Sequence, residues 1–151
     1  MATQQQSPVT LRVRRAIRAT PARVFQAWTT PAEMKRWKAP GDFSVAVAEV
    51  DLRVGGRYRV HMRAPDGSEH RVTGTYRVVD PPRKLVYTWM WETNPDMGDT
   101  VVTVEFRDVG GSTEVVLTHE LFPTEADRKE HEMGWAGSLD NLDALLAADP
   151  A

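Results

Sequence analysis

Cysteine is absent from the 151-residue sequence. Its absence excludes disulfide bridges, cysteine-ligated zinc and thiol catalysis, and it is compatible with the cytoplasm, where we expect the protein. No apolar run reaches the roughly 20 residues that a membrane-spanning helix needs. The segment 1–8, MATQQQSP, also lacks the charged-then-apolar pattern of a signal peptide. We therefore expect a disordered tail over residues 1–8 and no membrane span.

Motifs for metal, phosphate and nucleophilic chemistry are also missing. Neither GxGxxG nor GxxxxGK occurs, so Gly55-Gly56 is interpreted as a turn. His119 and His131 are each followed by Glu, but no second histidine completes an HExxH motif. Ser138 has no GxSxG context. We expect no metal and no cofactor, and we assign no catalytic residue.

Charge of one sign is scarce in each half of the chain. Residues 1–91 hold 16 Lys and Arg against 7 Asp and Glu, and residues 92–151 hold 3 against 14, giving +9 and −11. The two halves can complement each other within a monomer or across a homodimer. Alternatively, the basic half attracts an acidic partner or an anionic ligand.

The clearest local pattern is a C-terminal helix running from Thr124 to about residue 146. Thr124 followed by Asp127 is typical of a helix start. One face then carries apolar and aromatic residues at spacings of four, four, three and four: His131, Trp135, Leu139, Leu142 and Leu146. Gly134 and Gly137 flank Trp135 at a cost of about 1 kcal/mol each in a helix interior. The helix is either a simple core helix or the cover of a cavity.

The rest of the chain predicts a strand, two short helices and an antiparallel meander. Residues 9–18 alternate as a strand, in which Arg15 is either a bulge or an inward-pointing arginine. Thr20-Pro21 begins one helix, and Thr30 with Glu33 resembles a capping box for a second, which residues 39–41 end. Six further strands follow between residues 43 and 120, with turns at Gly, Pro and Asp clusters.

These elements predict an α+β helix-grip fold. A curved antiparallel sheet of about seven strands would wrap around the long C-terminal helix, with two short helices after the first strand. We expect a single domain over residues 9–147 and a short C-terminal tail over 148–151. The large aromatic residues of the strands fall on one face, which suits either a ligand cavity or a filled core.

Five segments carry a resemblance to a known family: TPARVFQAWTTPAEMKRW, DLRVGGRYRVHM, GTYRVVDPPRKLVYTW, TEVVLTHELFP and GWAGSLDNLDALL. In this order they resemble the START-like (SRPBCC) superfamily, and more narrowly the domain shared with the C-terminal part of the activator of heat-shock-protein ATPase. The resemblance extends over about residues 9–147.

The resemblance implies a START/Bet v-like helix-grip fold with a hydrophobic cavity between sheet and helix. Members of the superfamily include ligand-binding and ligand-sequestering proteins, an antibiotic-resistance protein, polyketide cyclases and the co-chaperone. Fold alone does not decide among these functions. The co-chaperone also has a separate N-terminal docking domain, for which we expect no room in this chain.

We therefore hypothesise a binding protein for an apolar or aromatic small molecule. The residues expected to line its cavity are Trp37, Met62, Tyr76, Trp89, Trp91, His119, Trp135 and Leu139. His119 and Tyr76 would orient a polar group of the ligand. The alternatives are a cyclase, dehydratase or hydrolase with His119 or His131 as acid or base, and a stress-related partner-binding module with a filled interior.

Nucleic-acid binding is not expected. Basic residues alternate along the strands: Arg57, Arg59, His61, Arg63, Arg71 and Arg77. Single-stranded nucleic acid would need exposed aromatic residues among these charges, and the aromatic residues fall on the opposite face. A solvated outer sheet surface is the simpler interpretation.

Overall fold

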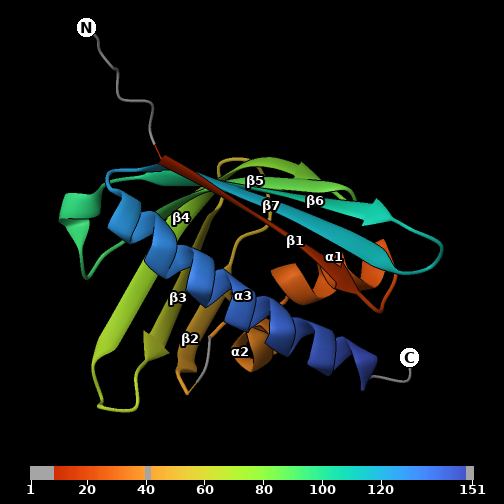
Figure 1. Ribbon diagram of the computed structural model, residues 1–151, viewed down its shortest axis with the longest axis horizontal. Helices are drawn as coiled ribbons and strands as arrows, with labels where there is room; N and C mark the ends of the chain where they lie inside the picture. The colour runs from red at the N-terminus through yellow and green to blue at the C-terminus, as the bar shows by residue number, and fades with distance from the viewer. Residues whose placement is uncertain (1–8, 40–41, 149–151) are drawn as a thin grey trace, which may run out of the picture.

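The computed structural model describes residues 9–39 and 42–148. The tail expected over residues 1–8, the break expected at residues 40–41 and most of the expected C-terminal tail lie outside the described residues. The elements follow one another in the predicted order (Figure 1), with a short 3-10 helix added in the predicted loop before β6. Their bounds are β1 Val9–Ile17, α1 Pro21–Thr29, α2 Pro31–Trp37, β2 Ser44–Val50, β3 Arg57–Arg63, β4 Glu69–Asp80, β5 Lys84–Trp91, η1 Pro95–Met97, β6 Thr100–Asp108, β7 Thr113–Phe122 and α3 Glu125–Ala147.

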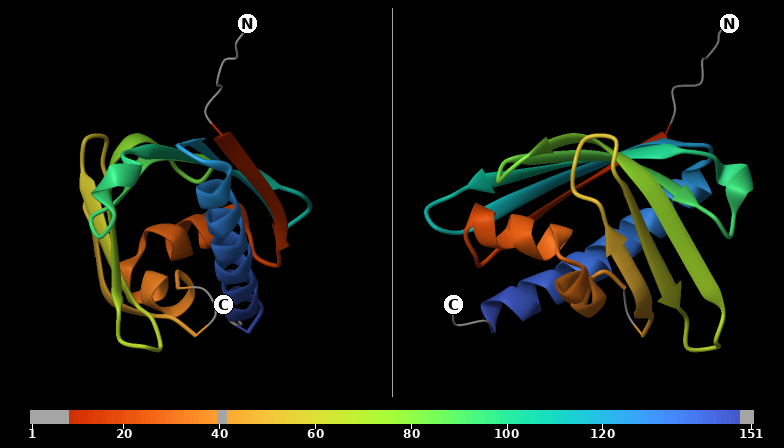
Figure 2. Two further views of the ribbon diagram at one scale, coloured as in Figure 1. Left: turned by 60° about the vertical axis from the view of Figure 1, so that its left-hand side comes forward. Right: turned by 180° about the vertical axis from the view of Figure 1, so that it is seen from behind.

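The strands form one antiparallel sheet in the order β1-β7-β6-β5-β4-β3-β2. Each strand from β2 to β7 pairs with its sequence neighbour, and β1 closes the far edge beside β7. Figure 2 shows the sheet curving around α1, α2 and α3, which all lie on its concave side. The predicted α+β helix-grip fold is confirmed.

The amphipathic pattern of α3 corresponds to its packing. Thr124 caps the helix by accepting a 3.1 Å hydrogen bond from the Asp127 amide. Trp135, Leu139, Leu142 and Leu146 are buried as predicted. Burial of each such side chain contributes roughly 1.5–3 kcal/mol before entropy costs. The apolar stripe is thus the surface by which α3 holds the sheet and the short helices.

The two short helices begin as proline-initiated turns. Thr20 accepts a 3.3 Å hydrogen bond from the amide of Arg23, as a helix cap does. The capping box predicted for Thr30 is wrong, because its side chain makes no capping hydrogen bond. Glu33, the expected partner, instead places its carboxylate 2.7 Å from the guanidinium of Arg23. This ion pair joins α1 to α2 directly.

The β1–β7 register and an ion pair with α3 show whether Arg15 is a bulge or an inward-pointing residue. The β1–β7 register runs without a shift from Leu11 to Ile17. Arg15 is therefore not a bulge: it lies on the Leu11 side of the strand and pairs with Asp140 of α3. Arg18 pairs with Asp143 at 3.1 Å. Opposite charges of the two halves thus meet within one chain.

Gly74 of β4 allows two strands and an aromatic ring to approach closely. A Cβ atom at this position would lie 1.9 Å from the carbonyl oxygen of Thr88 and 2.6 Å from the Tyr58 ring. The Tyr58 ring packs against Tyr76 and Tyr87 at centroid distances of 5.6 and 5.2 Å. Only glycine fits here, and the tyrosine cluster fills this part of the interior.

Candidate functional site

A cavity of about 640 Å³ lies between the concave face of the sheet, the first half of α3 and the end of α2. Ligand pockets commonly measure about 300–1,000 Å³. The residues that line it come from the end of α2 and the segment before β2, from β3, β4 and β5 with their adjoining loops, and from α3: Lys38, Phe43, Met62, Glu69, His70, Trp89, Trp91, Thr93, Asn94, Met97, Glu130, His131, Gly134, Trp135 and Ser138. The interior of the grip is therefore not completely filled by its own core.

The cavity changes from apolar to polar between its floor and its mouth. Lys38, Trp89 and Trp135 at the floor are only 4–5% exposed. Glu69 and Glu130 are exposed at the mouth. A ligand would therefore place an apolar part among buried rings and could keep polar groups near water.

Aromatic rings dominate the floor. Trp89 of β5 packs against Trp135 of α3 at a centroid distance of 5.2 Å and against Trp91 at 5.5 Å. Trp135 in turn stacks on Trp28 of α1, with an interplanar angle of 17°. The Trp89 indole Nε1 is buried and has no hydrogen-bond acceptor among the described residues. Aromatic surfaces of this kind supply contact area to flat apolar ligands.

Lys38 is the most unusual member of the lining. Its Nζ lies over five aromatic rings, at centroid distances of 5.0–5.7 Å: Trp28, Trp37, Tyr87, Trp89 and Trp135. Within the described ranges 9–39 and 42–148, no carboxylate forms an ion pair with it. Buried lysines are rare unless they are paired. A lone amine among rings therefore requires an explanation.

Burial lowers the pKa of Lys38 from 10.5 to about 7. Removing an ammonium ion from water costs several kcal/mol. The ring faces act in the opposite direction, because they attract a cation. Each such contact contributes about 0.5–2 kcal/mol, so the rings offset part of the cost of burial. With a pKa of about 7, a large fraction of the Lys38 amine carries no charge near neutral pH.

The backbone at Lys38 is held by hydrogen bonds. Its amide donates a 3.0 Å hydrogen bond to the carbonyl of Met34, and this bond ends α2. Its carbonyl accepts a 2.7 Å hydrogen bond from the hydroxyl of Ser138. Asn141, one turn further along α3, donates to the carbonyl of Ala39 at 2.9 Å. Helix α3 thus fixes the segment from which the amine enters the cavity.

His131 forms one side of the mouth. Its Nε2 accepts a 2.7 Å hydrogen bond from the indole of Trp91. Its Nδ1 lies 2.7 Å from the carbonyl oxygen of Asp127, to which only an N–H can donate. Burial lowers its pKa below 6.5. Both ring nitrogens are occupied in the neutral form, so His131 positions Trp91 rather than offering a free base.

His119 is buried behind the cavity floor. Its Nδ1 accepts a 3.1 Å hydrogen bond from the indole of Trp135. Its Nε2 is therefore the protonated nitrogen and donates to the Thr100 hydroxyl at 2.7 Å, which donates onward to the carbonyl of Trp89 at 2.9 Å. Burial, with the nearby His131 and Lys38, lowers the pKa of His119 well below 6.5. The geometry suits a neutral residue that fixes Trp135 and Trp89.

The structure brings half of the sequence-predicted ligand residues to the cavity surface. Met62, Trp89, Trp91 and Trp135 line it. The other predicted residues are buried but do not belong to the lining: Trp37, Tyr76, His119 and Leu139. The Trp37 ring centroid lies 5.2 Å from Lys38 Nζ, and its indole donates to the carbonyl of Ala27 at 2.9 Å. Direct ligand contact remains a prediction for the four lining residues.

Sequence reasoning did not identify Lys38. One signal was available, because Met34, Trp37 and Lys38 follow the i, i+3, i+4 spacing of a single helix face. A lysine on the apolar face of a short helix is unusual, more so in a chain with only 4 lysines among 19 basic residues. A long charged side chain is, however, normally assigned to solvent.

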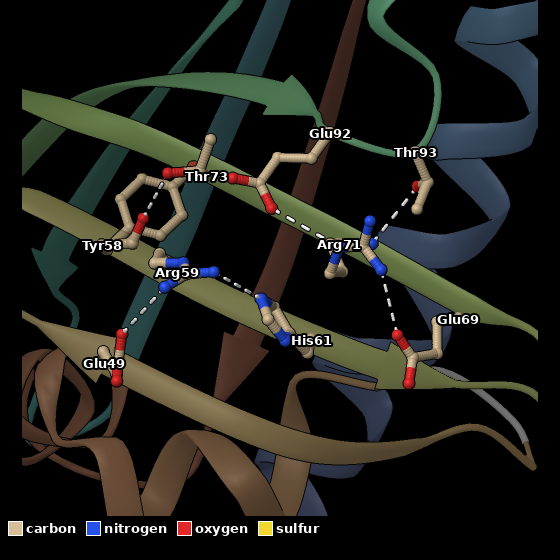
Figure 3. Close-up of polar contacts among 9 residues, drawn as sticks. All are labelled: Glu49, Tyr58, Arg59, His61, Glu69, Arg71, Thr73, Glu92 and Thr93. Atoms are coloured by element: carbon tan, nitrogen blue, oxygen red, sulfur yellow. Dashed lines mark hydrogen bonds and ion pairs between the residues drawn. The ribbon is translucent and has the colours of Figure 1, made fainter.

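The outer face of β2, β3 and β4 carries the basic residues singled out in the sequence. Figure 3 shows carboxylates beside two of them, Arg59 and Arg71. Arg59 lies 3.7 Å from Glu49, and Arg71 lies 3.0 Å from Glu69 and 3.6 Å from Glu92. The positive charge of this part of the surface is thus partly compensated within the sheet.

Metal ligation and membrane insertion have no counterpart in residues 9–39 and 42–148. No three His, Asp or Glu side chains in these ranges are grouped so that they could hold a metal ion. None of the helices in these ranges is both long and apolar enough to cross a membrane.

A curved antiparallel sheet that grips a long C-terminal helix, with two short helices after the first strand, defines a START-like protein. The family model of the Activator of Hsp90 ATPase homolog 1-like proteins matches residues 18–147. The chain belongs to this family. A search of curated proteins found no match.

Solved structures of bacterial proteins share the whole fold. A protein from Chromobacterium violaceum is 28% identical with a TM-score of 0.83, covering 93% of this chain and 98% of its own. The AHSA1 protein from Silicibacter pomeroyi is 26% identical with a TM-score of 0.80, covering 92% and 98%. The AHSA1-like protein from Aeromonas hydrophila is 29% identical with a TM-score of 0.75, covering 93% of each chain.

Proposed function

We propose that the protein binds an apolar or aromatic small molecule in the cavity between the sheet and α3. The observation that carries this proposal is the cavity of about 640 Å³ with buried indole rings at its floor. Its volume lies within the range of small-molecule sites. Apolar walls with a few polar groups are also typical of such sites. Trp89, Trp91 and Trp135 would supply the contact area, and Met62 would adapt to the ligand's shape.

Two alternatives receive less support. A partner-binding module with a filled interior would not need an open volume of this size. A histidine-dependent enzyme would need a nitrogen free to take a proton, but both nitrogens of His119 and of His131 are hydrogen-bonded. Binding is therefore the function that the geometry favours.

A fluorescence titration tests the proposal. N-phenyl-1-naphthylamine is a neutral aromatic probe whose emission rises when it leaves water. We expect saturable binding with one site per chain, accompanied by quenching of tryptophan emission, because three indoles line the cavity. The informative variant is Gly134→Leu, since Gly134 lines the cavity and a leucine there would occupy ligand space. Leucine is also a better helix former than glycine by about 1 kcal/mol, so weaker binding would not reflect a weaker helix.

Met133→Leu is the matched control. It introduces the same residue at the neighbouring position, where the side chain is 72% exposed. We expect Gly134→Leu to weaken probe binding at least about tenfold, equivalent to roughly 1.4 kcal/mol, and Met133→Leu to leave it unchanged. Absence of saturable binding to the unmodified protein would overturn the proposal. If the two variants bind the probe with equal affinity, the probe does not bind in this cavity.

A further inference from the structure

We propose that Lys38 forms imines, by condensing with the carbonyl group of an apolar or aromatic aldehyde or ketone held in the cavity. This inference rests on the proposed function, because the carbonyl compound must enter the same cavity. It adds a covalent step and a substrate class to simple binding.

The Lys38 amine is buried and lies at the cavity surface. Lys38 is 4% exposed yet belongs to the cavity lining. A lysine kept for a structural ion pair would have a carboxylate nearby, and none of the described residues provides one within 4.0 Å. Serine and asparagine side chains of α3 hold the backbone at Lys38 and Ala39 rather than the amine. The amine is therefore both positioned and chemically unused.

Aromatic rings surround the Lys38 amine. Five aromatic rings lie within 5.0–5.7 Å of Nζ and come from α1, α2, β5 and α3. They offer flat apolar surface to an aryl or alkenyl group next to the amine. They also limit water at the reaction centre, which favours an imine over its hydrolysis. The N–H of Trp89, whose ring is among the five, is buried and has no acceptor among the described residues.

The protonation state supports the geometry. Only a neutral amine is nucleophilic, and burial in apolar surroundings is an established way to activate a lysine. With its pKa lowered to about 7, Lys38 is roughly half neutral at pH 7, whereas an ordinary lysine is neutral to less than about 0.1%. Lys38 therefore has a roughly 1,000-fold advantage over the surface lysines in neutral amine.

The chemistry balances without an external oxidant or reductant. The Nζ lone pair attacks the carbonyl carbon, a C–N bond forms, and the carbonyl π electrons move to oxygen. Transfer of one amine proton to that oxygen gives a carbinolamine. The C–O bond then breaks, the second amine proton leaves with the oxygen as water, and a C=N bond remains. Hydrolysis by water that enters through the polar mouth reverses these steps and restores the lysine.

Reductive trapping tests the inference in the unmodified protein. The protein is incubated at pH 7 with 2-naphthaldehyde and sodium cyanoborohydride, which reduces an imine to a stable secondary amine. Intact-mass measurement counts the naphthylmethyl groups, and peptide mapping locates them. We expect the first group on Lys38, at a rate at least about tenfold above that of exposed Lys35 on the same helix or Lys129. Lys38→Met should abolish this fast label, and Lys35→Met should retain it.

A competition experiment separates this inference from the binding proposal. Naphthalene, which has no carbonyl group, and 2-naphthaldehyde are both tested for displacement of N-phenyl-1-naphthylamine. If both displace the probe but Lys38 is labelled no faster than Lys35, imine formation is overturned and binding stands. If neither displaces it and no fast label appears, both proposals fail. Because the labelled lysine is located by peptide mapping of the unmodified chain, the outcome does not depend on the folding of any variant.

Discussion

The hydroxyl of Ser138 donates a 2.7 Å hydrogen bond to the backbone carbonyl of Lys38, across 100 positions of sequence. Ser138 lies beside Leu139 on the buried face of α3, and Lys38 is the residue that ends α2. This contact, with the neighbouring bond from Asn141 to Ala39, joins the helix to the segment that carries the cavity's only amine among the described lining residues. The stability of the fold and the geometry of the site are therefore linked at this point.

Ser138→Ala should destabilise the protein, because it leaves a buried carbonyl without its donor. The expected loss is roughly 1–3 kcal/mol in the free energy of unfolding, measured by urea denaturation. The exposed serine at position 44 provides the control, and Ser44→Ala should change the same quantity by less than about 0.5 kcal/mol. Equal effects of the two substitutions would show that the Ser138 contact does not stabilise the α2–α3 junction.

Lys38→Met should raise the free energy of unfolding at pH 7, since it replaces a buried amine by an apolar side chain of similar length. The pKa of Lys38 is lowered to about 7 in the folded protein from 10.5. Between these values the unfolded chain binds the extra proton, so the unmodified protein gains stability as pH rises through this window. The advantage of Lys38→Met should accordingly shrink between pH 7 and pH 9.5.

Other titratable groups near Lys38 must be separated from this effect. Tyr87 and His119 surround the floor, and Glu69, His70, Glu130 and His131 line the mouth. The pKa values of His119 and His131 are lowered below 6.5, so these two histidines titrate below the pH range of this experiment. Burial raises the pKa of Tyr87 above 10.0, which sets the upper limit of the experiment. Thermal melts of the exposed-site variant Lys35→Met should track the unmodified protein, and a pH-independent gap for Lys38→Met would contradict the assigned pKa.

Acid should destabilise the fold through His119. Its pKa is lowered well below 6.5 by burial and by His131 and Lys38. As pH falls through 6.5 the unfolded chain gains a proton that the folded chain does not, so the free energy of unfolding falls. We expect a steep loss between pH 7 and pH 5, shared with His131.

His119→Phe should flatten this dependence even though it lowers stability at pH 7, where the Trp135 indole loses its acceptor. His61→Phe, on the outer sheet face, is the comparison. Denaturation curves at several pH values provide the slopes. If His119→Phe and the unmodified protein lose stability in parallel between pH 7 and pH 5, the acid sensitivity arises elsewhere.

Gly74→Ala should be strongly destabilising for its size. The added Cβ would lie 1.9 Å from the Thr88 carbonyl oxygen, which belongs to the backbone and cannot move aside cheaply. Overpacking of this kind typically costs about 1–3 kcal/mol. Arg77→Ala, at an exposed position of the same strand, should cost far less. A melting temperature for Gly74→Ala equal to that of Arg77→Ala would be incompatible with the packing of Tyr58 described above.

The fold could be predicted because its signals are local. Alternation along β3 and β5 and the four-, four-, three- and four-residue spacings of α3 report one buried face each, whatever the partner is. The same signals identify an inward side but not what lies opposite. Trp37 and Leu139 are buried, yet neither belongs to the cavity lining. Trp89 and Trp135 share that inward direction and do reach the open volume.

The lysine could not be placed by such reasoning. Its burial depends on rings from Trp28 to Trp135, which come together only when α1, β5 and α3 pack around the end of α2. The alternation along β7 predicts the inward face on which His119 lies. Its role, however, depends on hydrogen bonds to Trp135 and Thr100, which form only in the tertiary structure. Local pattern therefore predicts the walls of the site, and tertiary packing decides its chemistry.

The most direct measurement follows the five tryptophan indole N–H signals by NMR during titration with N-phenyl-1-naphthylamine. Binding in the cavity predicts saturable shifts of the Trp89, Trp91 and Trp135 signals. Smaller shifts are expected for Trp28 and Trp37, which do not belong to the cavity lining. Saturation with one common affinity would support the binding site. The absence of saturable shifts, or shifts confined to Trp28 and Trp37, would contradict it.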